Sequence, residues 1–103
     1  MSAAADSEGG GCYALVAGVV WQPLGDGVML LDVAKGEYFE LNPSGARMFE
    51  LVLSYPSLAL VEQQLLGEFE APIEQIRPDL QALLKTLQEA ELIRPAPPAV
   101  SRP

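Results

Sequence analysis

Hydrophobic residues in the first half of the chain follow the two-residue period of β-strands. Residues 16–22 are rich in β-branched and aromatic side chains, and the following segment, Pro23–Gly27, holds the Pro, Gly and Asp that reverse a chain. A second apolar run covers residues 28–33, and a third covers residues 37–41. The pattern predicts a three-stranded antiparallel meander.

The third predicted strand has two different faces. Phe39 and Leu41 share one face, while Tyr38 and Glu40 share the other, as in a half-buried sheet. We expect the first pair to face the core. A strand at the end of a small sheet also leaves one row of backbone N–H and C=O groups without protein partners.

In the second half of the chain, apolar residues recur at helical spacing. Asn42 followed by Pro43 predicts a helix start, because Asn caps orphan N–H groups and Pro is preorganised for the first helical position. This helix is expected to end at residues 55–56, and Ser57 is expected to cap the next helix. The predicted buried stripe of the second helix comprises Leu58, Val61, Leu65, Leu66 and Phe69.

A third helix is predicted from near Pro72 to about Ala90. Pro78 lies inside this range, and a helix that starts at Pro72 loses only an early backbone bond to Glu74 there. A shorter helix that starts near Asp79 is the alternative. The fold class is therefore α+β, with a three-stranded antiparallel sheet followed by three helices.

Both ends of the chain differ in composition from this predicted domain, residues 13–94. Residues 1–12 are small, acidic and Gly-rich, which predicts a disordered arm. Residues 95–103 are rich in Pro and predict an extended tail. The only cysteine, Cys12, can form no internal disulfide, and we expect it to be a surface thiol.

Charge and length limit the possible functions. The chain has 103 residues, a net charge of −8 and no histidine, which excludes catalytic triads and zinc sites built on His. Nucleic acid is an improbable partner because binding to phosphates depends on Lys and Arg. The longest apolar run, residues 13–21, is too short to span a bilayer, and no Lys or Arg precedes it. We therefore expect a soluble cytoplasmic protein without membrane contact.

Motifs for catalysis are missing from the sequence. It contains no Gly-rich phosphate loop, no metal-ligand spacing and no nucleophile elbow. Its carboxylates form no local pair that would separate an acid from a base. We therefore predict a protein that is not an enzyme, with no catalytic residue, no metal ion and no cofactor.

The order of the predicted elements is that of a winged helix-turn-helix, and the residues resemble a family within it. Gly-Val-Met-Leu-Leu-Asp at 27–32 and Gly-Glu-Tyr-Phe-Glu-Leu-Asn-Pro-Ser-Gly-Ala at 36–46 resemble the PqqD-like domains, also called RiPP recognition elements. The resemblance spans about residues 16–94. Two residues depart from the family pattern. Glu91 stands where the family often has a helix-ending Gly, and Pro78 stands directly before Asp79, which matches the family.

The resemblance implies a noncatalytic protein that holds the leader segment of a precursor peptide and presents it to processing enzymes. An extended leader would add as a fourth strand along the free edge of the third strand and place apolar side chains beside the third helix. The positions carried over from the family are Glu37, Tyr38, Phe39, Glu40 and Leu41 on the strand and Ile76, Asp79, Leu80 and Leu83 on the helix. For Leu80 and Leu83, ordinary core packing is the competing interpretation.

Two subfamilies and two other functions compete. Gly45-Ala46 is similar to the standalone proteins of lasso-peptide pathways, whose implied partners are a transglutaminase-like leader peptidase and a macrolactam synthetase. The alternative is PqqD proper, which serves pyrroloquinoline quinone synthesis with a radical SAM enzyme. A winged-helix DNA-binding protein and an accessory subunit without peptide affinity are further hypotheses.

Overall fold

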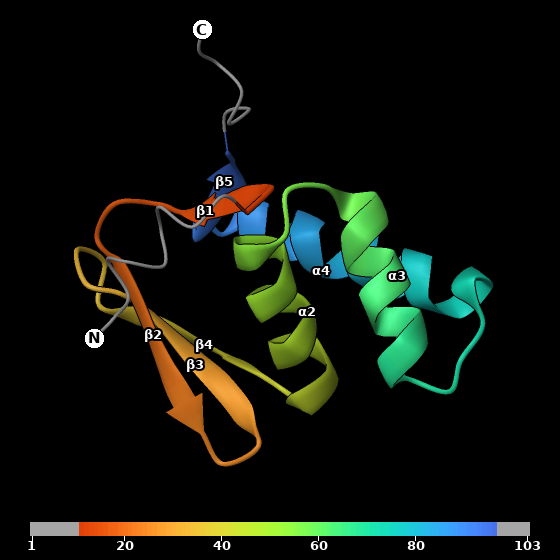
Figure 1. Ribbon diagram of the computed structural model, residues 1–103. Helices are drawn as coiled ribbons and strands as arrows, with labels where there is room; N and C mark the ends of the chain where they lie inside the picture. Colours follow the sequence, from red (N-terminus) through yellow and green to blue (C-terminus); the bar gives the residue numbers. More distant parts are fainter. Residues whose placement is uncertain (1–10, 97–103) are drawn as a thin grey trace, which may run out of the picture.

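The computed structural model describes residues 11–96, in which a small antiparallel sheet packs against three helices. The sheet has the strand order β2-β3-β4, and its strands are β2 (Val19–Leu24), β3 (Gly27–Asp32) and β4 (Glu37–Leu41). The helices that follow are α2 (Pro43–Ser54), α3 (Leu58–Glu68) and α4 (Ile73–Glu89). Helix α2 lies between the sheet on one side and α3 and α4 on the other (Figure 1). This α+β arrangement of the winged helix-turn-helix type confirms the predicted fold class.

The β2–β3 hairpin is tighter than predicted. Strand β2 continues through Pro23 to Leu24, and only Gly25 and Asp26 form the turn. Pro is tolerated here because β2 is an edge strand of its sheet. A Cβ atom on Gly27 would collide with the backbone oxygen of Leu41, so glycine lets the end of this hairpin approach the end of β4.

The predicted first strand, residues 16–22, is wrong at its start. Gly18 has a φ of 90°, and the Val19 N–H donates to the Val16 oxygen at 3.0 Å, which closes a turn at this point. Upstream of the turn, β1 (Tyr13–Leu15) pairs antiparallel with β5 (Ile93–Pro95) in a separate two-stranded sheet. The sequence did not indicate this pairing, because strands of three residues have almost no periodicity.

Most of the predicted arm, residues 1–12, and of the predicted tail, residues 95–103, lies outside the described residues. Where they overlap, the chain is hydrogen-bonded. The Cys12 N–H donates to the Tyr55 oxygen at 2.8 Å, and the Ala96 N–H donates to the Cys12 oxygen at 3.0 Å. Pro95, predicted to begin the tail, is the last residue of β5.

Cys12 is half-buried, so the prediction of a surface thiol is wrong. Its Sγ lies 3.7 Å from the Val52 oxygen, to which it donates. Burial raises the pKa of the Cys12 thiol. Because the thiolate is the reactive form, this thiol is less reactive than an exposed one.

Both predicted helix caps are present. The Asn42 Oδ1 accepts from the Gly45 N–H at 2.8 Å, with Pro43 as the first helical residue. The Ser57 Oγ accepts from the Leu60 N–H at 3.3 Å at the start of α3. These short-range bonds satisfy donors that the helix itself leaves unpaired.

Helix α4 has the longer of the two predicted forms. Pro72 is its N-cap residue, so the alternative start near Asp79 is wrong, and Pro78 lies inside the helix. At the other end, Glu91 adopts the left-handed conformation with a φ of 62°. The Glu91 N–H donates to the Gln88 oxygen and the Leu92 N–H to the Leu87 oxygen, the Schellman pattern that usually employs Gly.

The core extends from the inner face of the sheet across α2 to α3, α4 and the β1–β5 sheet. Trp21, Leu30 and Phe39 are register partners on this face. The Trp21 and Phe49 rings meet edge to face with centroids 5.4 Å apart, and Phe49 is fully buried. Leu66, which was predicted to be buried, is 43% exposed, so the stripe of α3 is narrower than its sequence indicated.

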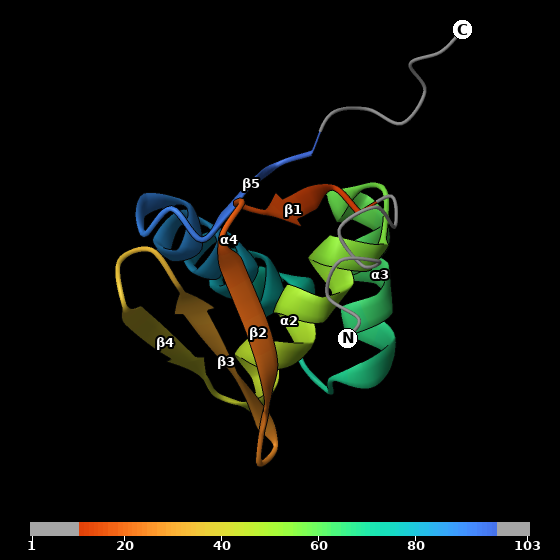
Figure 2. The same ribbon diagram turned by 90° about the vertical axis from the view of Figure 1, so that its left-hand side faces the viewer.

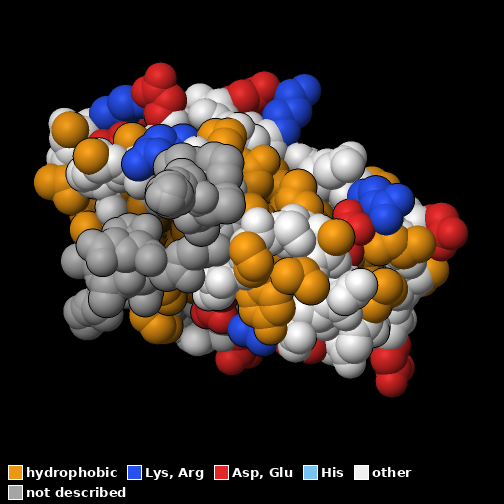
Figure 3. All heavy atoms as spheres, turned by 45° about the horizontal axis from the view of Figure 1, so that its top comes forward, with side chains coloured by type: hydrophobic (Ala, Val, Ile, Leu, Met, Phe, Trp, Pro, Cys, Tyr) orange, Lys and Arg blue, Asp and Glu red, His pale blue; other side chains and the backbone are white. Residues whose placement is uncertain are grey.

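Ion pairs connect elements that are distant in the sequence. Arg47 on α2 donates to Glu68 at the end of α3, with both nitrogen–oxygen distances at 2.7 Å. Arg77 pairs with Glu62, and Lys35 pairs with Glu91. On the face shown in Figure 3, basic and acidic side chains lie beside one another at the periphery, while hydrophobic side chains cross the centre. No helix in the described part of the chain is long and apolar enough to cross a membrane.

The Arg47–Glu68 pair predicts how stability depends on pH. Hydrogen bonds from Arg47 lower the pKa of Glu68 from its ordinary 4.5 to about 2. A lowered pKa contributes stability above the unfolded value, and that contribution is lost as the pH falls from 4.5 towards 2. Glu68→Gln should flatten this part of the stability profile, measured by urea unfolding across the pH range. Parallel profiles for the variant and the parent protein would show that the pair contributes nothing.

Candidate functional site

The free edge of β4 is the first component of the candidate site. Within the described residues β4 pairs only with β3, in the register Leu30↔Phe39 and Leu31↔Tyr38. Every second residue of an antiparallel strand directs both its N–H and its C=O to the same side. The outer row of these groups on β4 has no strand beside it, and β4 is the outermost strand in Figure 2.

Side chains on β4 follow the predicted alternation. Phe39 and Leu41 are half-buried on the inner face, whereas Glu37 and Glu40 are exposed. Tyr38 is 64% exposed, the highest exposure among the large hydrophobic residues of the described chain. The edge thus offers backbone groups for pairing and an aromatic side chain beside them.

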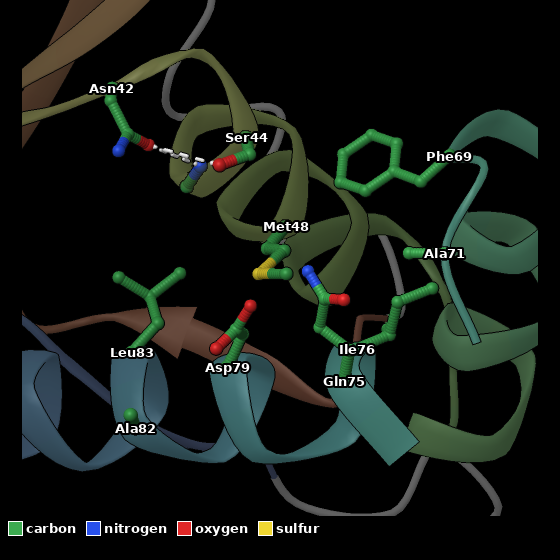
Figure 4. Close-up of a pocket in the computed structure, with 11 residues that line it drawn as sticks. Asn42, Ser44, Met48, Phe69, Ala71, Gln75, Ile76, Asp79, Ala82 and Leu83 are labelled. Carbon is green, nitrogen blue, oxygen red and sulfur yellow. Dashed lines mark hydrogen bonds between the residues drawn. The ribbon is translucent and has the colours of Figure 1, made fainter. Parts of the chain in front are cut away.

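A cavity of about 440 Å³ is the second component, and it begins where β4 passes into α2. Its walls come from the first turns of α2, the connection between α3 and α4, and the N-terminal half of α4 (Figure 4). Met48, Ile76 and Leu83 contribute apolar surface, while Gln75 and Asp79 project into the space from α4. The residues that line it are Asn42, Ser44, Gly45, Met48, Phe69, Ala71, Gln75, Ile76, Asp79, Ala82 and Leu83.

The predicted helix residues have different locations. Ile76, Asp79 and Leu83 line the cavity, with Asp79 exposed and Ile76 only 2% exposed. Leu80 is 1% exposed, belongs to the hydrophobic core and is not among the lining residues. The structure therefore brings three of the four α4 positions to the cavity next to β4.

Sequence reasoning missed the α2 and connection residues of this cavity. Asn42 was identified as a helix cap, yet it also lines the cavity because β4 leads directly into α2. The position of Asn42 directly after the predicted strand could have indicated that it lies near the site. Phe69 and Ala71 had no such signal, because their position depends on how α3 and α4 pack.

The electrostatics of the cavity are simple. Asp79 is its only ionisable lining residue. The Asn42 Oδ1 accepts from the Gly45 N–H and, at 3.2 Å, from the Ser44 Oγ. Across the described residues, no group of three His, Cys, Asp or Glu side chains could hold a metal ion. The arrangement is suited to binding an extended segment.

Comparisons with known proteins agree with this geometry. The family described as Coenzyme PQQ synthesis protein D (PqqD) matches residues 27–93. A solved structure of lasso peptide synthetase B1 complexed with the leader peptide is 30% identical, with a TM-score of 0.75 over 82% of this chain and 99% of that one. TbiB1 in complex with the TbiA(beta) leader peptide is 24% identical, with a TM-score of 0.72 over 81% and 96%, and it supports the fold. Curated protein sequences give no match. Since the family match covers most of the described fold, including β4 and α4, the chain belongs to the PqqD family.

Proposed function

We propose that this protein binds the leader segment of a ribosomally made precursor peptide in lasso-peptide biosynthesis. The observation that carries this proposal is the free edge of β4 beside a partly apolar cavity. A sheet edge and adjacent pockets together form the known strand-addition mode of peptide binding. The 30% identical lasso peptide synthetase B1, which was solved with a leader peptide, supports the same function.

Strand addition divides the recognition between backbone and side chains. Main-chain bonds to β4 provide affinity that does not depend on the peptide sequence. Side chains of an added strand alternate, so one set would face the cavity near Leu83 and Met48. The other set would lie beside Tyr38, whose exposed ring offers a large contact area.

The proposed role is noncatalytic and requires other proteins. The bound precursor would pass to a transglutaminase-like leader peptidase and then to a macrolactam synthetase. This transfer would take place in the cytoplasm, where ribosomal peptides are made. The second candidate is PqqD proper, because the matching family is described as Coenzyme PQQ synthesis protein D. Its partner would be a radical SAM enzyme.

Peptide titration of the isotopically labelled chain tests the proposal. The probes are synthetic leader segments from each short reading frame next to this gene. We expect one of them to bind with micromolar or better affinity and to shift amide resonances at Glu37–Leu41, Asp79 and Leu83. Shifts confined to the β1–β5 sheet, or none with any probe, would contradict the proposal. A precursor next to a radical SAM gene would select the PqqD alternative.

Tyr38→Ala is the companion variant in this titration. Loss of the ring should weaken binding by about fivefold to tenfold, as for a moderate interface aromatic. The free energy of unfolding should change by less than about 0.5 kcal/mol because Tyr38 is largely exposed. Val33→Ala, at a 60% exposed position in the β3–β4 loop, is the matched control and should bind normally. Equal binding by both variants would exclude Tyr38 from the site.

A further inference from the structure

We propose that the leader segment bound by this protein carries a Lys or Arg side chain that enters the cavity and pairs with Asp79. This inference rests on the proposed function and specifies the chemistry of the peptide. Four features of the structure support it: the charge of the cavity, the hydrogen bonding of the nearby helix start, the charge along β4 and the apolar lining of the cavity.

Within the part of the chain that the structure describes, the Asp79 carboxylate has no countercharge. It is the seventh residue of α4, and its side chain points into the space between α4 and α2 (Figure 4). It takes part in none of the ion pairs found among residues 11–96. Since it is the only ionisable residue of the lining, the cavity has a net negative charge. A bound cation would be attracted and a bound carboxylate repelled.

The start of α2 does not reverse this preference. Helix N-termini usually attract anions through free N–H groups. Here Pro43 has no N–H, the Gly45 N–H donates to the Asn42 Oδ1, and the Ala46 N–H donates to the Asn42 oxygen at 2.8 Å. The anion-binding capacity of this helix end is therefore largely used within the chain.

Among residues 11–96, no basic group supplies the missing charge. Arg47 and Arg77 are held by Glu68 and Glu62, and Lys85 lines a separate cavity. On β4 itself, Glu37 and Glu40 are exposed and belong to none of the ion pairs in the described part of the chain. These two carboxylates would repel an acidic strand and also a second copy of the same edge.

The apolar part of the cavity favours a long side chain. Met48, Ile76 and Leu83 line the space into which the Asp79 carboxylate projects. Lys and Arg can lay their methylene stems along apolar surface while their charged ends reach an acceptor. Such a side chain uses both the apolar lining and the carboxylate, whereas Ser or Gln would satisfy only part of the site.

Selection from a displayed library of random sixteen-residue peptides tests the inference. The full chain is immobilised as the parent protein, as Asp79→Asn and as Glu89→Gln. Glu89 is the matched control, because it is a carboxylate on the same helix about 15 Å from Asp79. We expect Lys or Arg to be enriched at one position of the peptides selected by the parent and by Glu89→Gln, and this enrichment to disappear with Asp79→Asn.

Charge reversal and affinity complete the test. Asp79→Lys should enrich Asp or Glu at the same peptide position, which a merely structural role for Asp79 would not produce. A selected peptide with its Lys or Arg changed to Gln should bind the parent about tenfold more weakly, and Asp79→Asn should bind both peptides alike. Peptides enriched without any preference for charge would overturn this inference and leave leader binding intact. If no peptide is enriched by the parent, the proposed function itself fails.

Discussion

An Ala82→Trp variant is expected to lose most of its affinity for leader peptide while it remains folded. Ala82 is an exposed residue on α4 that lines the cavity next to β4. An indole at this position would occupy space that the incoming peptide side chain requires. The peptide would then lose either the contact of that side chain with the cavity or its backbone pairing with β4. Binding should weaken by at least about tenfold, which corresponds to about 1.4 kcal/mol. Fluorescence anisotropy with a labelled peptide from the titration measures this loss.

Gln81→Trp is the control for this variant. Gln81 is the neighbouring residue, it is also exposed, and it lines the separate cavity formed with Tyr13 and Leu58. The same increase in size on the other side of α4 should leave peptide binding within about twofold of the parent, since surface substitutions away from an interface have small effects. If both variants bind like the parent, the cavity is not part of the site. If both lose binding equally, the loss reflects a disturbed helix.

Phe49→Ala is expected to cost about 3–5 kcal/mol of folding free energy. Phe49 is fully buried on α2, and its ring meets Trp21 edge to face at 5.4 Å. Truncation would leave a cavity between the sheet and α2 and remove the aromatic contact as well. Because small domains are only marginally stable, a large fraction of the molecules could unfold. Urea unfolding followed by circular dichroism measures the change.

Leu66→Ala provides the comparison for Phe49→Ala. Leu66 is 43% exposed on α3, so its truncation should change the unfolding free energy by less than about 1 kcal/mol. A similar loss in both variants would mean that the sheet–α2 contact is not the centre of stability. The comparison also tests the finding that Leu66 lies outside the core.

Local interactions explain why much of the fold was predictable. The caps at Asn42 and Ser57 involve atoms within a few residues, so the sequence could indicate them directly. Alternation along residues 37–41 likewise identified the faces of β4, because side chains of a strand point to opposite sides. The helix start at Pro72 was the first of two starts that the sequence left open, and Pro78 is accommodated early in α4.

Errors occurred where distant segments determine the local structure. Strand β5 exists because Ile93–Pro95 meets β1, which lies some eighty residues earlier in the chain. Cys12 is half-buried because its N–H donates to the Tyr55 oxygen and its Sγ to the Val52 oxygen, about forty residues later in the chain. Leu66 fits the helical stripe in sequence but remains exposed, since α3 contacts its neighbours through a narrower face.

The candidate site shows the same division. Family resemblance supplied β4 and the α4 positions, and alternation indicated which β4 residues face outward. The cavity, by contrast, needed the folded chain: it joins the start of α2, the α3–α4 connection and α4, and it leaves Leu80 in the core while Asp79 and Leu83 reach the lining. Sequence patterns report which face of an element is apolar, because periodicity is a local property. Which faces meet, and which charge remains unpaired between them, depends on helix packing across segments that are far apart in the chain.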